Sequence, residues 1–533
     1  MQKKVTIKLL PSEAAQSESV IQYAARAAGL SPSQVTGFNI LKRSLDARSR
    51  QVWILLTLEL FIGEPYQKRK LYAPTYQDIT GARKKVIIVG AGPAGLFAAL
   101  RFLESGIQPI ILERGKDVRA RRRDLALLNK EGIINPESNY CFGEGGAGTY
   151  SDGKLYTRST KRGDVQRILN ILVNFGAEES ILYESHPHIG TNKLPAIISA
   201  IRKQITGSGG LFVFEKKVTD FILRDGLLEG VSCSDRSVYL ADAVVLATGH
   251  SARDIYHLLN GRKILIQPKS FALGVRIEHP QSLIDSIQYH QSFLQPGEHE
   301  QSYVNNRTYL PPAAYSLVHQ VEGKGVFSFC MCPGGIIATA STGPAELVVN
   351  GWSPSKRNNP FANSGMVMSV GEEDLVPFRK HGPLAGMYFQ EAVEKKAFQA
   401  GGGHFVAPAQ RMADFVDGRV SQSLPPCSYL PGILSSPLNE VLPGFILTGL
   451  RKGFVAFGKK MKGYYTNEAV VVATESRTSS PVRIPRDPNS LQHPVLKNLY
   501  PCGEGAGYAG GIVSAAMDGE AVAGQIAARF GAS

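Results

Sequence analysis

Several features are missing from this chain of 533 residues, and each absence excludes a class of protein. No stretch holds the roughly 18 unbroken apolar residues that a membrane-spanning helix needs. The opening MQKKVTIKLL is too short and too polar for a signal peptide. Six cysteines are spread over the chain without a CxxC pair, which argues against a disulfide framework and a structural zinc site. We therefore expect a cytoplasmic protein that binds no metal and no membrane.

What is present is globular composition, with 43% hydrophobic and 20% charged residues in a chain long enough for several domains. The net charge of +14 is uneven. Residues 1–83 contain 12 Lys and Arg against 6 acidic residues, and residues 114–130 contain 7 against 2. A solvated surface explains such an excess. The other interpretation is a surface that attracts an anionic ligand, such as a nucleotide, an acidic metabolite or RNA.

The periodicity of the apolar residues changes along the chain and predicts three domains. Residues 1–80 are typical of a small N-terminal β-α-β-β unit, ferredoxin-like or a truncated version of it, with a helix over about 12–30. Residues 84–270 and 479–533 show the strand, glycine turn and helix of a Rossmann-like α/β domain in two pieces. The intervening residues 271–478 are richer in strands and turns and indicate an inserted α+β substrate or cap domain.

A dinucleotide-binding fingerprint opens the second predicted domain. Gly90, Gly92 and Gly95 form GxGxxG between the strand VIIV and an alanine-rich helix. The first glycine permits a tight turn, the second lets backbone amides approach a pyrophosphate, and the third lets helix and strand pack closely. Glu113 ends the following strand and is predicted to accept hydrogen bonds from the adenosine ribose. The fingerprint alone suits NAD as well as FAD.

Two distant stretches resemble the two-domain FAD proteins that include p-hydroxybenzoate hydroxylase and the fumarate reductase flavoproteins. The first is ADAVVLATGHSARD, which holds Ala247, Thr248 and Gly249. The second is the C-terminal NLYPCGEGAGYAGG, which holds Gly503 and Glu504. In that class the first stretch packs near the cofactor, and an acid in the second hydrogen-bonds the ribityl chain. The resemblance implies non-covalent FAD, with Glu504 in this last role.

The stretch CFGEGGAGTYSDGKL holds five glycines in fifteen residues. In the resembled class a glycine-rich loop lies along the isoalloxazine ring, where a larger side chain would collide with the ring. The residues that match this loop are Gly145, Gly146, Ala147, Gly148 and Thr149. A helix that starts near the C-terminus is predicted to point at the pyrimidine edge of the flavin, where negative charge accumulates on reduction. Its first residues are Gly510, Gly511 and Ile512.

Along nearly its whole length the chain resembles the uncharacterised FAD-dependent dehydrogenases, also described as NAD(FAD)-utilising dehydrogenases. The resemblance rests on the ERGK turn, FGEGGAGTYSDGKL, LGVRIEHPQ, FCMCPGG and GEGAGYAGGIVSAAMDG. It implies bound FAD and a redox role, and it brings no substrate. The further cofactor contacts that it suggests are Pro93 and Ala94 in the fingerprint, Arg114 in the ERGK turn, Arg122 for the pyrophosphate and the backbone of Val218 for the adenine.

Candidate catalytic groups lie in these shared stretches. Cys330 and Cys332 suggest a flavin-linked dithiol. However, residues i and i+2 of a regular strand have Cα atoms roughly 6.5 to 7 Å apart, at the edge of what a disulfide tolerates, which favours a buried apolar pair. Arg276, His279 and Lys154 are candidates to orient substrate or move a proton, and Arg276 is also a candidate for a structural ion pair. Two more arginines have only their charge in their favour, Arg307 and Arg357.

One nucleotide fingerprint is present and not two, so any nicotinamide would bind transiently over the flavin. We expect an FAD-dependent oxidoreductase that holds an unidentified small organic substrate between the flavin and the cap domain, with NAD(P)H as a candidate electron donor. Two alternatives stay open. One is a flavin-dependent RNA-modifying protein, suggested by the basic N-terminal domain, although that domain lacks the interleaved aromatics of an RNA-binding sheet. The other is a non-enzymatic FAD-binding sensor.

Overall fold

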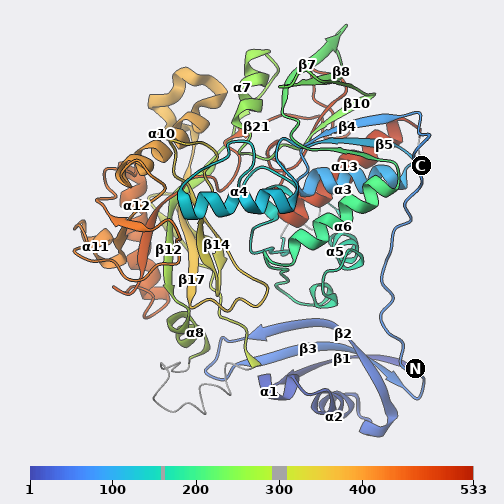
Figure 1. The fold of residues 1–533 in the computed structure, drawn as a ribbon. Coiled ribbons are helices and arrows are strands. Elements are labelled where there is room, and N and C mark those ends of the chain that lie inside the picture. The colour runs from blue at the N-terminus through green and yellow to red at the C-terminus, as the bar shows by residue number, and fades with distance from the viewer. Residues whose placement is uncertain (158–162, 291–308, 532–533) are drawn as a thin grey trace.

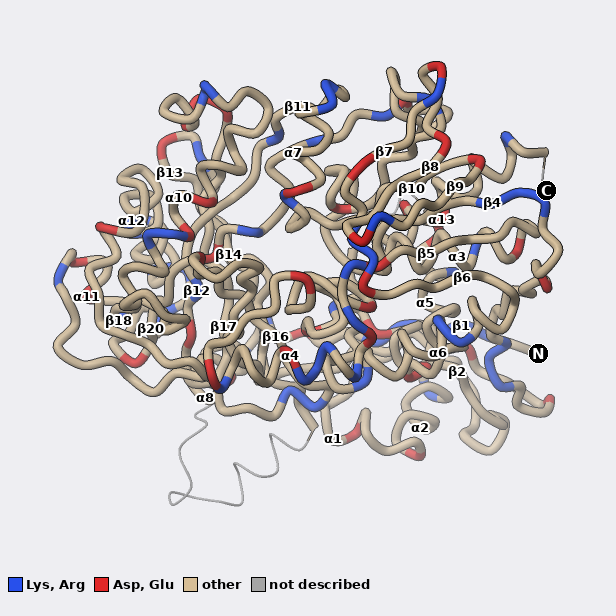
Figure 2. The backbone as a smooth tube through the Cα atoms, turned by 45° about the horizontal axis from the view of Figure 1, so that its top comes forward, with Lys and Arg blue, Asp and Glu red and all other residues tan. Residues whose placement is uncertain are grey.

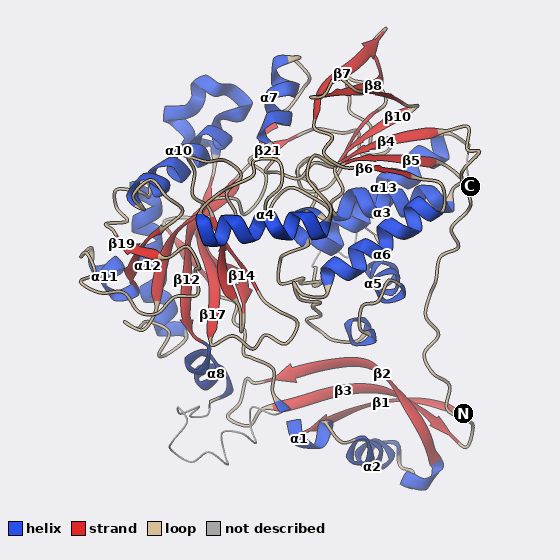
Figure 3. Ribbon diagram, viewed as in Figure 1, coloured by secondary structure: helices blue, strands red, loops and turns tan. Residues whose placement is uncertain are grey.

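The computed structural model describes residues 1–157, 163–290 and 309–531, and three sheets carry most of its architecture (Figures 1 and 3). Figure 1 shows a small sheet next to the N-terminus, a parallel sheet beside α3 and α13, and a large sheet with long strands on the other side of α4. Arg307, one of the arginine candidates, lies outside the described residues.

The small sheet has three antiparallel strands in the order β1-β3-β2. Their bounds are β1 (Gln2–Leu9), β2 (Val35–Asp46) and β3 (Trp53–Ile62). Alternation in β1 buries Val5, Ile7 and Leu9 in a core that α2 shares, while the polar residues between them face solvent. The helices and the 3-10 turn of this unit are α1 (Pro11–Ala14), α2 (Ser17–Ala28) and η1 (Pro32–Gln34).

Two details of this unit bear on the sequence predictions. The single helix expected over about 12–30 is two helices, because Gln16 takes an extended conformation and caps a new helix. The strand order is that of the first three strands of a ferredoxin-like sheet. No second helix and strand follow within residues 1–80, so the assignment to the ferredoxin-like class stays a prediction.

The parallel sheet has five strands in the order β22-β10-β4-β5-β6. The run VIIV in β4 is buried throughout, as a parallel strand covered on both faces requires. The strands are β4 (Lys85–Val89), β5 (Gln108–Leu112), β6 (Leu211–Val213), β10 (Ala243–Leu246) and β22 (Leu499–Pro501). The surrounding helices are α3 (Pro93–Glu104), α4 (Val118–Glu131), η2 (Gly146–Gly148), α5 (Val165–Asn174), η4 (Glu179–Leu182), α6 (Leu194–Gly207), α7 (Arg253–Gly261) and α13 (Ile512–Arg529). An antiparallel sheet separates β6 from β10 in the chain and contains β7 (Val218–Arg224), β8 (Leu227–Cys233) and β9 (Val238–Leu240).

The large sheet has seven strands in the order β13-β14-β17-β12-β20-β18-β19 and is antiparallel except between β18 and β19. Its strands are β12 (Phe271–Pro280), β13 (Val318–Val321), β14 (Lys324–Cys332), β17 (Phe361–Val370), β18 (Ala407–Arg411), β19 (Ile433–Ser435) and β20 (Val470–Glu475). The other elements of this part are α8 (Gln281–Tyr289), β15 (Ile336–Thr339), β16 (Val349–Trp352), η5 (Glu372–Leu384), α10 (Ala385–Ala400), α11 (Met412–Asp417) and α12 (Gly444–Lys460). The strands of this sheet and the helices on it share one extensive core.

The chain passes into the large sheet and returns from it along neighbouring strands. Just before β12, the short strand β11 (Gln267–Pro268) pairs with β21 (Val482–Arg483), which lies just after β20. β12 and β20 are themselves hydrogen-bonded neighbours. The two crossings between the parallel sheet and the large sheet therefore lie side by side.

The charged residues do not form one dominant patch along the backbone. Figure 2 shows Lys and Arg over the whole chain, interspersed with Asp and Glu. Among the described residues, none of the helices combines the length and apolar character that crossing a bilayer requires. The same residues contain no group of three or more His, Cys, Asp and Glu placed to hold a metal ion.

Candidate functional site

The GxGxxG turn lies at the carboxyl end of β4, where the chain enters α3. Gly90 has a φ of +104°, and a Cβ atom there would lie 2.6 Å from the carbonyl oxygen of Ala247. A Cβ atom on Gly95 would lie 2.1 Å from the carbonyl oxygen of Gly90. Both positions therefore require glycine. Gly92 caps α3 and Pro93 is its first residue, which leaves the first amides of the helix at a free end.

The loop that contains residues 143–149 packs directly on this turn. The N–H of Gly145 donates to the carbonyl oxygen of Ala91 at 2.9 Å. A Cβ atom on Gly146 would lie 3.2 Å from the Cα atom of Gly92. The structure thus brings together two glycine-rich segments that lie about fifty residues apart in the sequence.

Two further segments join the same place. A Cβ atom on Gly148 would lie 3.4 Å from Cγ1 of Ile512, the first residue of α13. A Cβ atom on Gly505 would lie 2.4 Å from the carbonyl oxygen of Gly249, in the turn that follows β10. A Cβ atom on Gly90 would also lie 3.2 Å from the Cα atom of Thr248. The predicted cofactor segments from four parts of the sequence therefore converge at the carboxyl edge of the parallel sheet.

Bare backbone borders open space at this edge. A Cβ atom added to any of four glycines would meet nothing within 4 Å, and these glycines are Gly92, Gly249, Gly510 and Gly511. Ligands of open parallel sheets bind at the carboxyl ends of the strands, and a pyrophosphate needs close approach of backbone amides. The residues at this edge therefore fit a dinucleotide cofactor.

Glu113 is buried at the end of β5, and its carboxylate already binds backbone. It accepts hydrogen bonds from the backbone N–H groups of Ala91 at 2.9 Å, Gly115 at 2.9 Å and Gly143 at 3.0 Å. A carboxylate offers about four lone-pair positions, so about one is left for a ligand. The role toward the ribose stays a prediction. The contacts add a second role, because this side chain ties the fingerprint turn and the following loop to β5.

The basic residues after β5 differ in environment. Arg114 forms ion pairs with Glu137 at 2.6 Å and Asp254 at 2.9 Å, and its guanidinium lies 4.1 Å from the ring centre of Phe142. Its charge is thus already neutralised by the protein, and its contact with the cofactor stays a prediction.

Arg121, the neighbour of the predicted Arg122, is the arginine of α4 that binds the backbone of the glycine loop. Arg122 is exposed, whereas Arg121 is fully buried. The buried guanidinium donates to the carbonyl oxygens of Asn139, Tyr140 and Glu144, each at 2.8 Å. The sequence could have indicated that Arg121 is buried, because the buried residues of α4 follow the helical period. These residues are Val118, Arg121, Asp124, Leu125 and Leu128.

Arg121 also stabilises the loop of residues 143–149 through side-chain contacts. Its Nη1 donates to Oγ1 of Thr149 at 3.2 Å, and that hydroxyl donates to the carbonyl oxygen of Glu144 at 2.7 Å. Gly143 has a φ of +121°, and a Cβ atom there would lie 2.4 Å from Cδ of Arg121. The arginine therefore supports the loop, and the pairing of Arg122 with the pyrophosphate stays a prediction.

Other predicted contacts lie at the margins of the site. Val218 begins β7, pairs with Cys233 and is buried in the core beneath the parallel sheet, so its backbone role toward adenine stays a prediction. Oε1 of Glu504 lies 3.3 Å from Nδ1 of His250, and the Glu504 side chain is 29% exposed. Glu504 is thus accessible to a ligand.

Asp518 was not a sequence candidate, although it binds the C-terminal glycine turn. Its Oδ2 accepts the N–H of Gly503 at 2.7 Å, and Arg486 forms an ion pair with it at 2.6 Å. The side chain is buried in α13. Nothing in the sequence distinguishes this acid from others in the tail, because its partner lies 32 residues away.

Two of the candidate catalytic residues on β12 are enclosed by protein. Arg276 and Glu475 form a fully buried ion pair at 2.8 Å, which is the structural alternative for this arginine. Nε2 of His279 lies 2.9 Å from the carbonyl oxygen of Tyr464, and burial lowers the pKa of His279 to about 4. None of the described contacts of His279 joins it to the glycine segments. Arg357, for its part, pairs with Asp152 at 2.6 Å.

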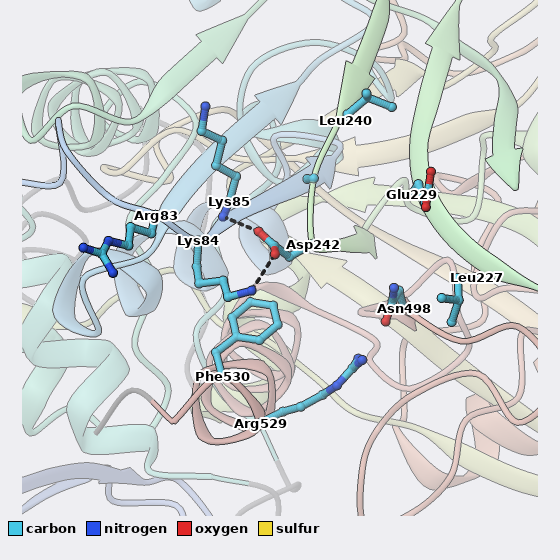
Figure 4. Close-up of a pocket in the computed structure, with 11 residues that line it drawn as sticks. Arg83, Lys84, Lys85, Leu227, Glu229, Leu240, Asp242, Asn498, Arg529 and Phe530 are labelled. Atoms are coloured by element: carbon cyan, nitrogen blue, oxygen red, sulfur yellow. Dashed lines mark hydrogen bonds and ion pairs between the residues drawn. The ribbon is translucent and has the colours of Figure 1, made fainter. Parts of the chain in front are cut away.

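A cavity of about 810 Å³ opens at the opposite edge of the parallel sheet (Figure 4). Lys84, Asp242 and Asn498, which precede β4, β10 and β22, border it together with the end of α13. Figure 4 shows Lys84 and the backbone of Lys85 holding Asp242, at 2.7 and 2.9 Å. Because the amino edge of such a sheet is not where dinucleotides bind, this cavity is separate from the candidate site.

Comparison with known proteins gives three family matches. The description "FAD binding domain" matches residues 83–127, and "FAD-dependent protein, C-terminal domain-like" matches residues 270–478. A domain of unknown function matches residues 1–61. Together with the glycine segments at the carboxyl edge of the sheet, these matches define a flavoprotein that binds FAD.

A protein of Clostridium beijerinckii, described as uncharacterized, is 39% identical over 521 residues, which cover 94% of both chains. The chain belongs to the same family as that protein. A thiamine thiazole synthase of Aeropyrum pernix is 29% identical over 178 residues, which cover 32% of this chain and 56% of the synthase. Neither match carries the name of a dehydrogenase, so membership of the dehydrogenase family stays a prediction.

Two solved structures resemble most of the chain at low similarity. A flavocytochrome c3 fumarate reductase is 13% identical and covers 84% of this chain and 79% of its own, with a TM-score of 0.33. A geranylgeranyl bacteriochlorophyll reductase-like protein of Thermoplasma acidophilum is 11% identical and covers 84% and 80%, with a TM-score of 0.34. Scores this low carry no argument about function.

Proposed function

We propose that this protein is an FAD-dependent oxidoreductase that acts on a small organic substrate. The observation that carries the proposal is the convergence of four glycine-rich segments at the edge of the sheet where such cofactors bind, with several of their glycines free of neighbours where a side chain would be. The bound cofactor would supply hydride chemistry, and the protein would supply binding, orientation and electrostatics.

The fingerprint turn would hold the adenosine and pyrophosphate portions of FAD. In this proposal the amides at the head of α3, next to Gly92, bind the pyrophosphate, and the remaining lone pair of Glu113 accepts a ribose hydroxyl. Arg121 contributes by keeping the neighbouring loop in place. The fingerprint residues that we assign to cofactor binding are Gly90, Gly92, Pro93, Ala94 and Gly95.

The flavin portion would lie along the loop and the start of α13. The loop residues Gly145–Thr149 leave room for a flat ring, and their positions on Gly92 and Ile512 are consistent with this role. The free amides after Gly511 would stabilise negative charge at the nearby edge of the ring. Glu504, partly accessible beside His250, is the acid that we assign to the ribityl chain.

We further propose that the strand-rich residues 271–478 form a cap that selects the substrate. They are encoded between the two pieces of the parallel-sheet part, residues 84–270 and 479–533. Their sheet reaches the candidate site through β14. The carbonyl oxygen of Met331 in this strand accepts a hydrogen bond from the ammonium group of Lys154. Lys154 follows the glycine loop in the sequence, so the cap and the loop meet there.

The first test is anaerobic mixing of the purified yellow protein with NADH and, separately, with NADPH, while the visible flavin band is recorded. Rapid bleaching by one of them would identify a reductase or monooxygenase driven by nicotinamide. If neither bleaches the band but dithionite does, the substrate itself or a partner protein is the donor. A flavin that resists both dithionite and photoreduction would contradict the proposal, since an oxidoreductase must reduce its flavin.

A further inference from the structure

We infer that Cys330 and Cys332 form a redox-active dithiol that opens and closes as a disulfide beside the flavin site. The sequence alone favours a buried apolar pair, because a regular strand holds such residues at the edge of disulfide geometry. The structure removes that objection in two respects: the strand is not regular there, and the surroundings of the two thiols are charged.

β14 contains a bulge at this pair. Phe329 pairs with Gly365 and Cys332 pairs with Asn363, so one extra residue is accommodated between them. Cys330 has a φ of +47°, which is uncommon for a residue with a side chain. Bulges redirect side chains and often lie next to active sites. The regular spacing on which the apolar interpretation depends is therefore absent.

The two cysteines interact with each other and with buried positive charge. The thiol of Cys332 donates to the carbonyl oxygen of Cys330 at 3.2 Å, and Nη2 of Arg276 donates to that carbonyl at 2.7 Å and to Sγ of Cys332 at 3.5 Å. Interaction with the Cys332 thiol, followed by the charges of Lys154 and Arg276, lowers the pKa of Cys330 although burial opposes this. A lowered pKa favours the thiolate, which is the form that attacks a disulfide or another electrophile.

The pair is also next to the glycine loop. The ammonium of Lys154 donates to the carbonyl oxygen of Met331, between the two cysteines. Two residues earlier, Asp152 pairs with Arg357, whose carbonyl oxygen would lie 1.7 Å from a Cβ atom on Gly334. The turn after β14 is thus packed against the segment that continues from Gly148.

The proposed step balances as follows. Oxidation forms one Sγ–Sγ bond and releases two protons and two electrons, and FAD accepts the two electrons with two protons. Reduction by an external dithiol reverses the change at the cysteines. The inference rests on the proposed function only for the identity of the oxidant, because the pair can also be titrated against a soluble dithiol.

The test equilibrates the full-length protein with a series of reduced and oxidised dithiothreitol ratios, quenches with an alkylating reagent and measures the tryptic peptide 325–356. This peptide contains Cys330 and Cys332 and no other cysteine. We expect a single transition from two alkylated cysteines to a disulfide-linked form. Cys427, half-buried as Cys330 is, lies on the tryptic peptide 420–451, which is recorded in the same digest as the internal control and should stay alkylated at every ratio. Alkylation of both Cys330 and Cys332 at every ratio would overturn the inference.

A second measurement asks whether the flavin and the pair share electrons. We expect anaerobic dithionite to be consumed at two equivalents per FAD in the oxidised protein, and at one equivalent in Cys332→Ala, with Cys427→Ala as the matched variant that keeps two. One equivalent in the wild type would overturn the link to FAD. A protein without reducible flavin but with the peptide transition would contradict the proposed function alone, so the two failures are distinguishable.

Discussion

The glycines of the candidate site fall into two groups by what a side chain would meet. Gly90 and Gly95 face backbone atoms closer than any real Cβ contact, whereas Gly92 faces open space. The first group is required by the fold. The second is needed only if something occupies the space, which is the physical meaning of a binding-site glycine.

This difference gives a paired prediction. We expect Gly92→Ala to change the free energy of unfolding of the flavin-free protein by no more than about 0.5 kcal/mol, because its φ of −74° suits alanine. The same change should weaken FAD binding at least tenfold, about 1.4 kcal/mol. Gly95→Ala should instead cost about 1–3 kcal/mol of stability through overpacking.

Urea unfolding of the flavin-free variants and a titration with FAD check both statements. Unchanged FAD affinity in Gly92→Ala would place the pyrophosphate elsewhere.

Arg121 supports a second prediction at this scale. Replacing it with methionine keeps much of its volume but leaves three carbonyl groups without their donor. We expect a loss of about 3–5 kcal/mol in stability. Arg122→Ala, one residue along, should lie within about 0.5 kcal/mol of wild type because that side chain is exposed. Thermal or chemical unfolding of the two variants measures both losses of stability. Equal losses would contradict the structural role that we assign to Arg121.

Residue-level prediction from the sequence succeeded where glycine geometry is itself the signal. The turn at Gly90 and the loop at Gly145 could be identified because only glycine tolerates such positions. The structural role of Arg121 was missed although the helical period of α4 was readable, since charge was weighed without the buried face of the helix; the pairing of Arg122 with the pyrophosphate stays a prediction. Asp518 could not be found, because its importance depends on a partner that only the folded chain brings near.

At the scale of elements, α13 and α3 pack so closely that their contact requires a glycine at one position of α13. A Cβ atom on Gly519 would lie 2.1 Å from the carbonyl oxygen of Ala94 in α3, whereas one on Gly524, five residues later in α13, would meet nothing within 4 Å. The two helices lie side by side along the parallel sheet (Figure 1).

The two positions of α13 make a matched pair. Gly519→Ala should push α13 from α3 and cost about 1–3 kcal/mol. Gly524→Ala should stabilise by about 0.5–1 kcal/mol, because alanine loses less backbone entropy in a helix. Chemical denaturation of the flavin-free proteins measures both. Stabilisation by Gly519→Ala would mean that the contact with Ala94 is looser than described.

At the level of elements, the apolar pattern predicted whether a segment is a strand or a helix better than it predicted where an element is interrupted. The alternation in β1 and the buried run in β4 are strong periodic signals, and both strands form as expected. The break between α1 and α2 and the bulge in β14 are not periodic. They depend on local backbone states at Gln16 and Cys330, which no pattern of apolar residues encodes.

For the whole molecule, the small N-terminal sheet has a core cluster of its own, and it meets the core of the large sheet only at its β2–β3 end, through Leu45 and Val52 among the described residues. A ligand stabilises only the unit whose unfolding releases it. We therefore expect added FAD to slow amide hydrogen exchange in β4, α3 and α13 strongly, and to leave β1 and the adjacent half of β3 nearly unchanged. Hydrogen-exchange mass spectrometry with and without FAD tests this. Equal protection of β1 would indicate that the units unfold together.

The side-by-side crossings at β11 and β21 have a consequence for how such a chain can change over evolutionary time. A segment whose two ends are hydrogen-bonded neighbours spans a gap of roughly one strand spacing, about 4.8 Å, whatever its internal length. Such a segment can be lost, lengthened or replaced without disturbing the scaffold that carries it, as insertions between neighbouring chain ends generally can. The parallel sheet can then keep its cofactor-binding edge while the segment between β11 and β21 is exchanged.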